Sequence, residues 1–197
     1  MFKLRDEDAA KKIIELIKKE NVNLRFMHVC GTHQDTLVRF GIEQMLKDTG
    51  VEIRQGPGCP VCVTTADEIA DAITLANSGV TIAVFGDMMK VPTPIGSLAD
   101  AKSNGADVRI VYSIEDAVRL SSEVDKMVFM AIGFETTSPT TAAVMVEDLP
   151  ENFSVYSCHR ILLPALQAII NMGEFHIDGL IEPGHVAVIT GTKIFDE

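Results

Sequence analysis

Short apolar runs alternate along the chain with longer segments in which apolar residues recur at helical spacing. The runs predict strands at 24–29, 51–54, 80–85, 108–112, 127–132, 153–157 and 178–182. The segments between them predict helices at 6–20, 34–47, 66–77, 97–104, 114–123, 139–148 and 162–172. Strands that are apolar throughout are buried on both faces, which is typical of parallel sheets covered by helices. The pattern therefore predicts an α/β fold.

The polar stretch at 121–126 divides the predicted strands into four and three. The segments VCGTHQDT and IGFETTSPT both follow a strand and open a helix, which is a weak internal repeat. We therefore expect two small parallel-sheet α/β lobes facing a cleft, the first over 1–123 and the second over 124–197. The second lobe would be incomplete by one strand, and its exposed sheet edge would favour homo-association.

Charge and composition narrow the class of protein. The chain has 17 Lys and Arg against 28 Asp and Glu, a net charge of −11, which argues against a nucleic-acid or anionic-membrane partner. The first residues form a charged amphipathic pattern without a signal-peptide apolar stretch, and no apolar run approaches the roughly 18 residues that span a bilayer. We expect a cytoplasmic protein whose four cysteines are reactive or metal-binding rather than disulfide-bonded.

The segment GPGCPVC at 56–62 places Cys59 and Cys62 between a predicted strand and a predicted helix. Two glycines and two prolines fix an unusual backbone there, and TADE at 65–68 predicts a capping box. We expect the positive end of that helix to favour the thiolate form of both cysteines. The alternative is a pair of buried small residues beside a turn.

Other candidate residues follow the remaining strands, and functional groups collect at the carboxyl ends of parallel strands. Cys30 and His33 in CGTH have the surroundings of an activated thiolate at a helix N-terminus, although a tight turn and a helix cap would also account for them. Glu135 in GFETT could bind an anion, position a partner or cap a helix. His28 and Cys158 are more typical of the core. We expect all four cysteines on one exposed rim.

Three functions would account for such thiols. A thioredoxin-type oxidoreductase places CxxC between a strand and a helix, but this chain has no Trp and an all-parallel pattern. A structural zinc site would need a second CxxC or a pair of histidines nearby. A scaffold that holds iron through thiolates is the third alternative.

Several segments together resemble the HypD family of [NiFe]-hydrogenase maturation factors. They run in order from about residue 24 and read MHVCGTHQDT, QGPGCPVC, FGDMMKVPTPIGSL, GADVRIVYS, GFETTSPT and IEPGHVAVITGT. The resemblance implies an assembly scaffold rather than a free-standing enzyme. It would bind the chaperone HypC and the cyanide-donating protein HypE, while an iron ion acquires cyanide and carbon monoxide before delivery to the hydrogenase.

The resemblance also implies roles for individual residues. Cys30 would bind iron, Cys59 and Cys62 would form a redox-active dithiol and serve as further thiolate ligands, and His33 and Glu135 would take part in the chemistry. Soft thiolates suit the ferrous iron that binds cyanide and carbon monoxide. A thiol–disulfide oxidoreductase acting on proteins stays as the alternative.

The chain departs from the family in two places. Relatives continue into a region whose cysteines ligate a [4Fe–4S] cluster, and this chain has no counterpart of that cysteine cluster, so we expect a fragment or a short form. Gln34 also differs from many relatives, which puts a direct role of position 34 in doubt.

Overall fold

Two parallel sheets covered by helices make up the fold, which a computed structural model describes over residues 6–195. The smaller sheet has the order β2-β1-β7 and the larger sheet the order β4-β3-β5-β6. All of these strand pairs are parallel, which confirms the expected α/β class. The strands are β1 Leu24–His28, β2 Val51–Gln55, β3 Thr81–Phe85, β4 Val108–Val111, β5 Met127–Gly133, β6 Phe153–His159 and β7 Gly179–Ile181.

The helices lie where the sequence predicts them, with one difference and several additions. The segment expected at 34–47 begins earlier, at Gly31, and divides into α2 and α3 because Gly41 takes a left-handed conformation with φ 64°. The short elements α4, α10, η1 and η2 were not predicted. The helices are α1 Glu7–Glu20, α2 Gly31–Arg39, α3 Ile42–Lys47, α4 Pro60–Val63, α5 Ala66–Asn77, α6 Leu98–Ser103, α7 Ile114–Ser121, α8 Ser138–Met145, α9 Leu162–Met172 and α10 Gly184–Thr190, with the 3₁₀ turns η1 Gly86–Lys90 and η2 Lys193–Phe195.

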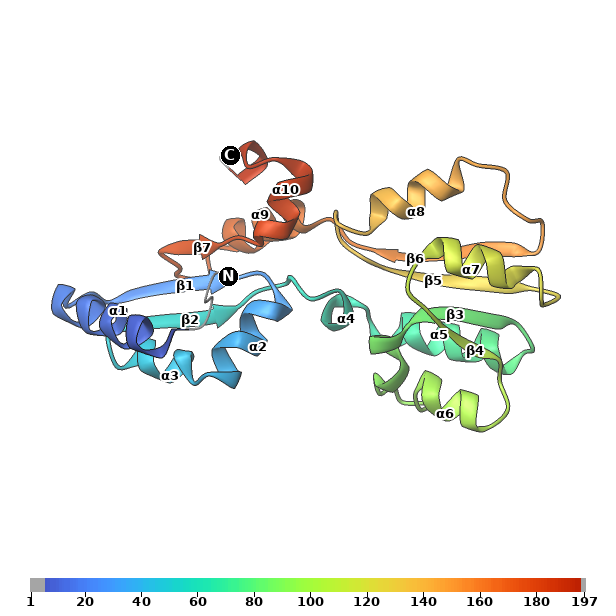
Figure 1. Cartoon of the computed structure of the whole chain (residues 1–197), viewed down its shortest axis with the longest axis horizontal. Coiled ribbons are helices and arrows are strands. Elements are labelled where there is room, and N and C mark those ends of the chain that lie inside the picture. Colours follow the sequence, from blue (N-terminus) through green and yellow to red (C-terminus); the bar gives the residue numbers. More distant parts are fainter. Residues whose placement is uncertain (1–5, 196–197) are drawn as a thin grey trace.

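The strands group differently from the expected division into four and three. β7 pairs with β1, so the smaller sheet combines the first two strands of the chain with the last one. The expected boundary between residues 123 and 124 therefore does not separate the two sheets. The chain crosses between the sheets twice, once from β2 through α4 to α5 and once from β6 to α9 (Figure 1). Periodicity along the sequence could not reveal this pairing, because it joins segments at opposite ends of the chain.

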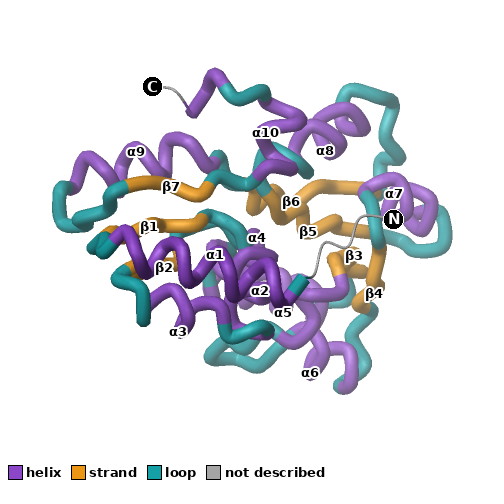
Figure 2. Tube along the Cα trace, turned by 60° about the vertical axis from the view of Figure 1, so that its left-hand side comes forward, coloured by secondary structure: helices purple, strands orange, loops and turns teal. Residues whose placement is uncertain are grey.

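Helices cover both faces of the larger sheet. β5 is buried along its whole length, and its alternate residues face opposite layers. Val128, Met130 and Ile132 pack with α5 and α6, whereas Met127, Phe129 and Ala131 pack with α7 and α8. Figures 1 and 2 show the same layering in the smaller sheet, with α9 on one side and α2 and α3 on the other.

The described helices include none that is long and apolar enough to cross a membrane. The edge strands are β2 and β7 in the smaller sheet and β4 and β6 in the larger one. Association of two copies through an exposed edge stays a prediction.

Candidate functional site

The CGTH and GPGCPVC motifs meet at the carboxyl ends of β1 and β2. A Cβ atom on Gly58 would lie 1.5 Å from the carbonyl oxygen of Val29 and 2.7 Å from the backbone nitrogen of Cys30. Only glycine therefore lets this loop lie against the end of β1. On the other side of the junction, a Cβ atom on Gly31 would lie 3.5 Å from Cβ and 3.6 Å from Sγ of Cys59. The first turn of α2 thus contacts the first cysteine of the CxxC motif.

Cys30 begins α2 as its N-cap residue, in the extended conformation that starts a helix. Its carbonyl oxygen accepts hydrogen bonds from the backbone nitrogens of His33 at 3.1 Å and Gln34 at 3.3 Å. Only 6% of Cys30 is exposed. The prediction of a helix N-terminus is confirmed, but the prediction of an exposed rim is wrong for Cys30, because the loop at Gly58 packs against its backbone.

Three histidines surround the start of α2. His28 is fully buried, as expected, and its Nε2 forms a hydrogen bond with Oε1 of Gln34 at 2.8 Å. The rings of His28 and His33 pack edge to face with centroids 5.7 Å apart. Burial lowers the pKa of His33, and the charges of His28 and His185 lower it further. His33 is therefore neutral at pH 7, the form that binds metals and accepts protons.

The EPGH segment adds two residues that were not among the predicted site residues. The backbone nitrogen of Val29 donates to the carbonyl oxygen of Ile181 at 3.4 Å, so the ends of β1 and β7 are neighbours. Beyond β7 lie Glu182 and His185. Oε2 of Glu182 is buried without a hydrogen-bond partner, and burial raises the pKa of this carboxyl group. The available signal in the sequence was that EPGH at 182–185, like QGPGC at 55–59, lies at the end of a predicted strand and contains Pro-Gly.

The CxxC motif opens the four-residue helix α4, with Cys59 as its N-cap and Pro60 as its first residue. All cysteines of the chain are free. A hydrogen bond with Cys59, together with partial burial, raises the pKa of Cys62 to about 11. Cys62 therefore keeps its proton at neutral pH, and the expectation that both cysteines favour the thiolate form is wrong for this one.

The start of α5 is capped by its own side chains. The predicted capping box is present, because the backbone nitrogen of Thr65 donates to Oε2 of Glu68 at 2.8 Å and that of Glu68 donates to Oγ1 of Thr65 at 3.2 Å. Two backbone donors at this helix end, those of Thr65 and Glu68, are thus satisfied by its own side chains. The carboxylate of Glu68 also offsets the positive end of the helix.

Glu135 connects the GFETT turn to another helix. Its Oε1 accepts a hydrogen bond from the backbone nitrogen of Leu162, the first residue of α9, at 2.8 Å. Its Oε2 is buried without a partner. Of the roles that the sequence left open, the structure therefore supports that of a helix cap, although the capped helix is α9 rather than the one that follows GFETT.

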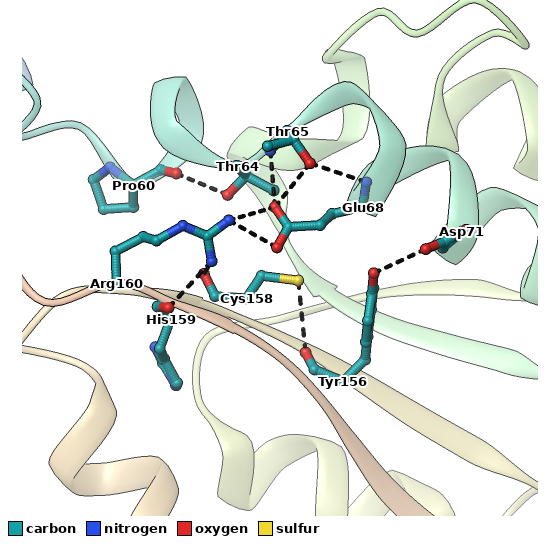
Figure 3. Close-up of polar contacts among 9 residues, drawn as sticks. All are labelled: Pro60, Thr64, Thr65, Glu68, Asp71, Tyr156, Cys158, His159 and Arg160. Atoms are coloured by element: carbon teal, nitrogen blue, oxygen red, sulfur yellow. Dashed lines mark hydrogen bonds and ion pairs between the residues drawn. The ribbon is translucent and has the colours of Figure 1, made fainter.

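Cys158 lies apart from the other cysteines. It is buried in β6 and packs in the core between the larger sheet and α5 and α6. Burial, followed by the negative charge of Glu68, raises the pKa of Cys158 to about 11. Figure 3 shows it beside the ion pair of Glu68 and Arg160. A single rim with all four cysteines is therefore not present, and Cys158 is a core residue.

The predicted iron ligands were Cys30, Cys59 and Cys62. Over residues 6–195, no three His, Cys, Asp or Glu side chains are grouped closely enough to hold a metal ion. The site instead offers a buried thiol at the start of α2 and the pair of thiols of the CxxC motif beside it. Such a pair can be oxidised reversibly to a disulfide.

Comparisons with known proteins agree with the motifs. A family model described as HypD, hydrogenase formation hypA family, matches residues 7–197. A putative hydrogenase expression/formation protein of Methanocaldococcus jannaschii is 44% identical, over 98% of this chain and 56% of that protein. The hydrogenase maturation factor HypD of Escherichia coli is 41% identical, over 88% of this chain and 48% of that protein. The hydrogenase maturation factor HypD2 of Bradyrhizobium diazoefficiens is also 41% identical, over 98% of this chain and 54% of that protein. The chain spans about half the length of these curated relatives.

Proposed function

We propose that this chain, which belongs to the HypD family of hydrogenase maturation factors, serves as a scaffold in the assembly of the iron unit of [NiFe]-hydrogenase. In this proposal an iron ion is the cargo. It is held through cysteine thiolate while cyanide and carbon monoxide are attached to it.

The contact between the CGTH and GPGCPVC motifs carries this proposal. Gly58 lies against the backbone of Cys30, and Gly31 lies against Cys59, so a potential iron ligand and a potential redox pair share one junction. A tight turn alone would not require cysteines on both sides of the contact. The neutral His33 lies in the same turn as Cys30 and could accept a proton when the Cys30 thiol binds iron.

The proposed division of labour follows the chemistry of the thiols. Cys30 supplies a thiolate to the iron, and the other coordination positions are left to cyanide, carbon monoxide and a ligand from a partner. Cys59 and Cys62 close to a disulfide and release two protons, and their two electrons reduce the donor from which a ligand is transferred to the iron. Glu135 acts through α9, whose start it caps, and not through direct contact with the iron.

The partners in this proposal are the chaperone HypC and the cyanide-donating protein HypE, and the compartment is the cytoplasm. No comparison supports the alternative of a thiol–disulfide oxidoreductase. A catalytic oxidoreductase would turn over in an insulin-reduction assay, which separates the two functions.

The test is anaerobic purification of the chain together with HypC, followed by metal analysis and infrared spectroscopy of the cyanide and carbonyl stretching region. We expect iron in the complex and its loss in Cys30→Ala. The matched control is Cys158→Ala, which removes a buried thiol outside the junction and should retain iron. Equal iron contents of Cys30→Ala and the parent would refute the assignment of Cys30.

A further inference from the structure

The dithiol lies on one of the two chain segments that cross between the sheets. An ion pair joins this segment to the second crossing segment. Glu68 lies in the first turn of α5, just beyond α4, and Arg160 directly follows β6. Nη2 of Arg160 lies 2.8 Å from both carboxylate oxygens of Glu68 (Figure 3). The ion pair therefore ties the two crossings together next to the CxxC motif.

The helix that carries the dithiol depends on its neighbours for its position. α4 has only four residues and none of them is fully buried, although Val61 packs against the core of the larger sheet and Val63 against that of the smaller one. Helices shorter than about 12 residues are marginal in water without packing. At its upstream end, the contact of Gly58 with the end of β1 fixes the loop. At its downstream end, Oγ1 of Thr64 donates to the carbonyl oxygen of Pro60 at 2.8 Å, and the capping box of α5 follows.

Glu68 takes part in both the capping box and the ion pair. Its Oε2 accepts hydrogen bonds from the backbone nitrogen of Thr65 at 2.8 Å and from the Thr65 hydroxyl at 3.1 Å, in addition to the contact with Arg160. Burial would raise the pKa of Glu68, but the hydrogen bonds from Arg160 and Thr65 more than offset it and the pKa is lowered. The carboxylate is therefore charged at neutral pH.

Arg160 is held in turn by the end of the larger sheet. Its backbone nitrogen donates to the carbonyl oxygen of Gly133 at 2.9 Å. Its Nη1 donates to the carbonyl oxygens of Cys158 and His159, both at 3.2 Å. The planar guanidinium thus has a fixed orientation before it meets Glu68.

We propose that Glu68 and Arg160 are positioning residues for the dithiol of Cys59 and Cys62, and that their ion pair sets how readily the two thiols close to a disulfide. This proposal rests on the proposed redox role of the dithiol. The capping box alone is enough to start α5. We therefore assign the additional ion pair of Glu68 with Arg160 a second role, which is to hold α4 in position. Disulfide closure needs a narrow geometry, and any freedom that α4 gains makes closure less favourable.

The experiment measures the equilibrium between dithiol and disulfide in the full chain, in mixtures of oxidised and reduced dithiothreitol. On closure, Cys59 and Cys62 lose two electrons and two protons, and the cyclic disulfide of oxidised dithiothreitol takes up both as it opens to the dithiol. Alkylation followed by mass spectrometry gives the fraction closed. The rate of alkylation of Cys59 is measured separately, because it reports position without any redox step.

The variants are Arg160→Ala and Glu68→Gln, with Arg160→Lys as the conservative variant that keeps the charge. The matched control is Arg109→Ala, which breaks an ion pair with Glu123 at the opposite edge of the larger sheet. We expect Arg160→Ala and Glu68→Gln to lower the closure constant about fivefold, which corresponds to about 20 mV for a two-electron couple. Arg160→Lys should recover part of this loss, and Arg109→Ala should match the parent within about twofold.

Folded Arg160→Ala and Glu68→Gln variants with the closure constant and alkylation rate of the parent would overturn the proposal. If Arg160→Ala fails to fold, Glu68→Gln decides, because glutamine keeps the shape of the side chain and an acceptor for Thr65. A parent chain that never forms the Cys59–Cys62 disulfide would refute the redox part of the proposed function. In that case the alkylation rates of Cys59 still decide the positioning role, and equal rates in the parent and Glu68→Gln would overturn it.

Discussion

The contact of Gly58 with the end of β1 gives the sharpest test of how the site is assembled. In Gly58→Ala the new Cβ atom would lie 1.5 Å from the carbonyl oxygen and 1.9 Å from the carbonyl carbon of Val29. Real Cβ atoms essentially never approach other heavy atoms within 3.0 Å. The loop must therefore move away from β1 by about 1.5 Å, the difference between 3.0 and 1.5 Å.

Backbone atoms stand on both sides of this contact, so no side chain can turn away to relieve it. Overpacking of a filled site costs about 1–3 kcal/mol, and we expect Gly58→Ala to lower the free energy of unfolding by the upper part of that range, about 3 kcal/mol. The moved loop would also uncover Cys30, which should then react faster with iodoacetamide.

Urea unfolding followed by far-ultraviolet circular dichroism measures the first effect, and mass-spectrometric mapping of alkylation measures the second. The matched control is Gly184→Ala, because a Cβ atom there would meet nothing within 4 Å. A free energy of unfolding for Gly58→Ala within about 0.5 kcal/mol of the parent would refute the argument from close packing.

Three further predictions concern other residues of the site and its surroundings. Glu135→Ala should lower the free energy of unfolding by about 1 kcal/mol because α9 loses its cap, and Glu135→Gln should lose less; equal urea midpoints for all three chains would contradict this. Alkylation of Cys62 should accelerate about tenfold per pH unit from pH 7 to 10, since its pKa is about 11, and a plateau below pH 9 would contradict the raised value. Burial lowers the pKa of His159 from its ordinary value of 6.5, so below pH 6.5 the unfolded chain binds a proton that the folded chain does not. Stability should therefore fall as pH falls through this window, and His159→Gln should reduce the loss measured between pH 7 and 5.5.

Local patterns in the sequence were sufficient for most of the secondary structure. The helix predicted at 66–77 has the same bounds as α5, and its capping box of Thr65 and Glu68 is present. The helix predicted at 162–172 coincides with α9. Both rest on spacing and capping within one segment. The helix predicted at 34–47 was less accurate because the break at Gly41 depends on a backbone conformation that periodicity does not reveal.

In the candidate site too, local patterns identified the residues but not the contacts between distant parts of the chain. The motifs identified Cys30, His33, Cys59 and Cys62 as candidates without any structure, because thiols beside a helix N-terminus, glycine and histidine have the surroundings of reactive cysteines. The partner of Glu68 was not predictable, because Arg160 is 92 positions away and no local pattern connects the two. The raised pKa of Cys62 was missed for a related reason, since it depends on how α4 turns toward Cys59.

The sequence by itself determined the alternation of strands and helices, the parallel α/β class and the motifs by which the chain belongs to the HypD family. Those features depend on residues that are close together in the chain. Only the tertiary structure decided which strands share a sheet, which thiols lie at one junction and which is buried in the core. These depend on contacts between distant segments, such as β1 with β7 and Gly58 with Val29, whose geometry is fixed only when the whole chain packs.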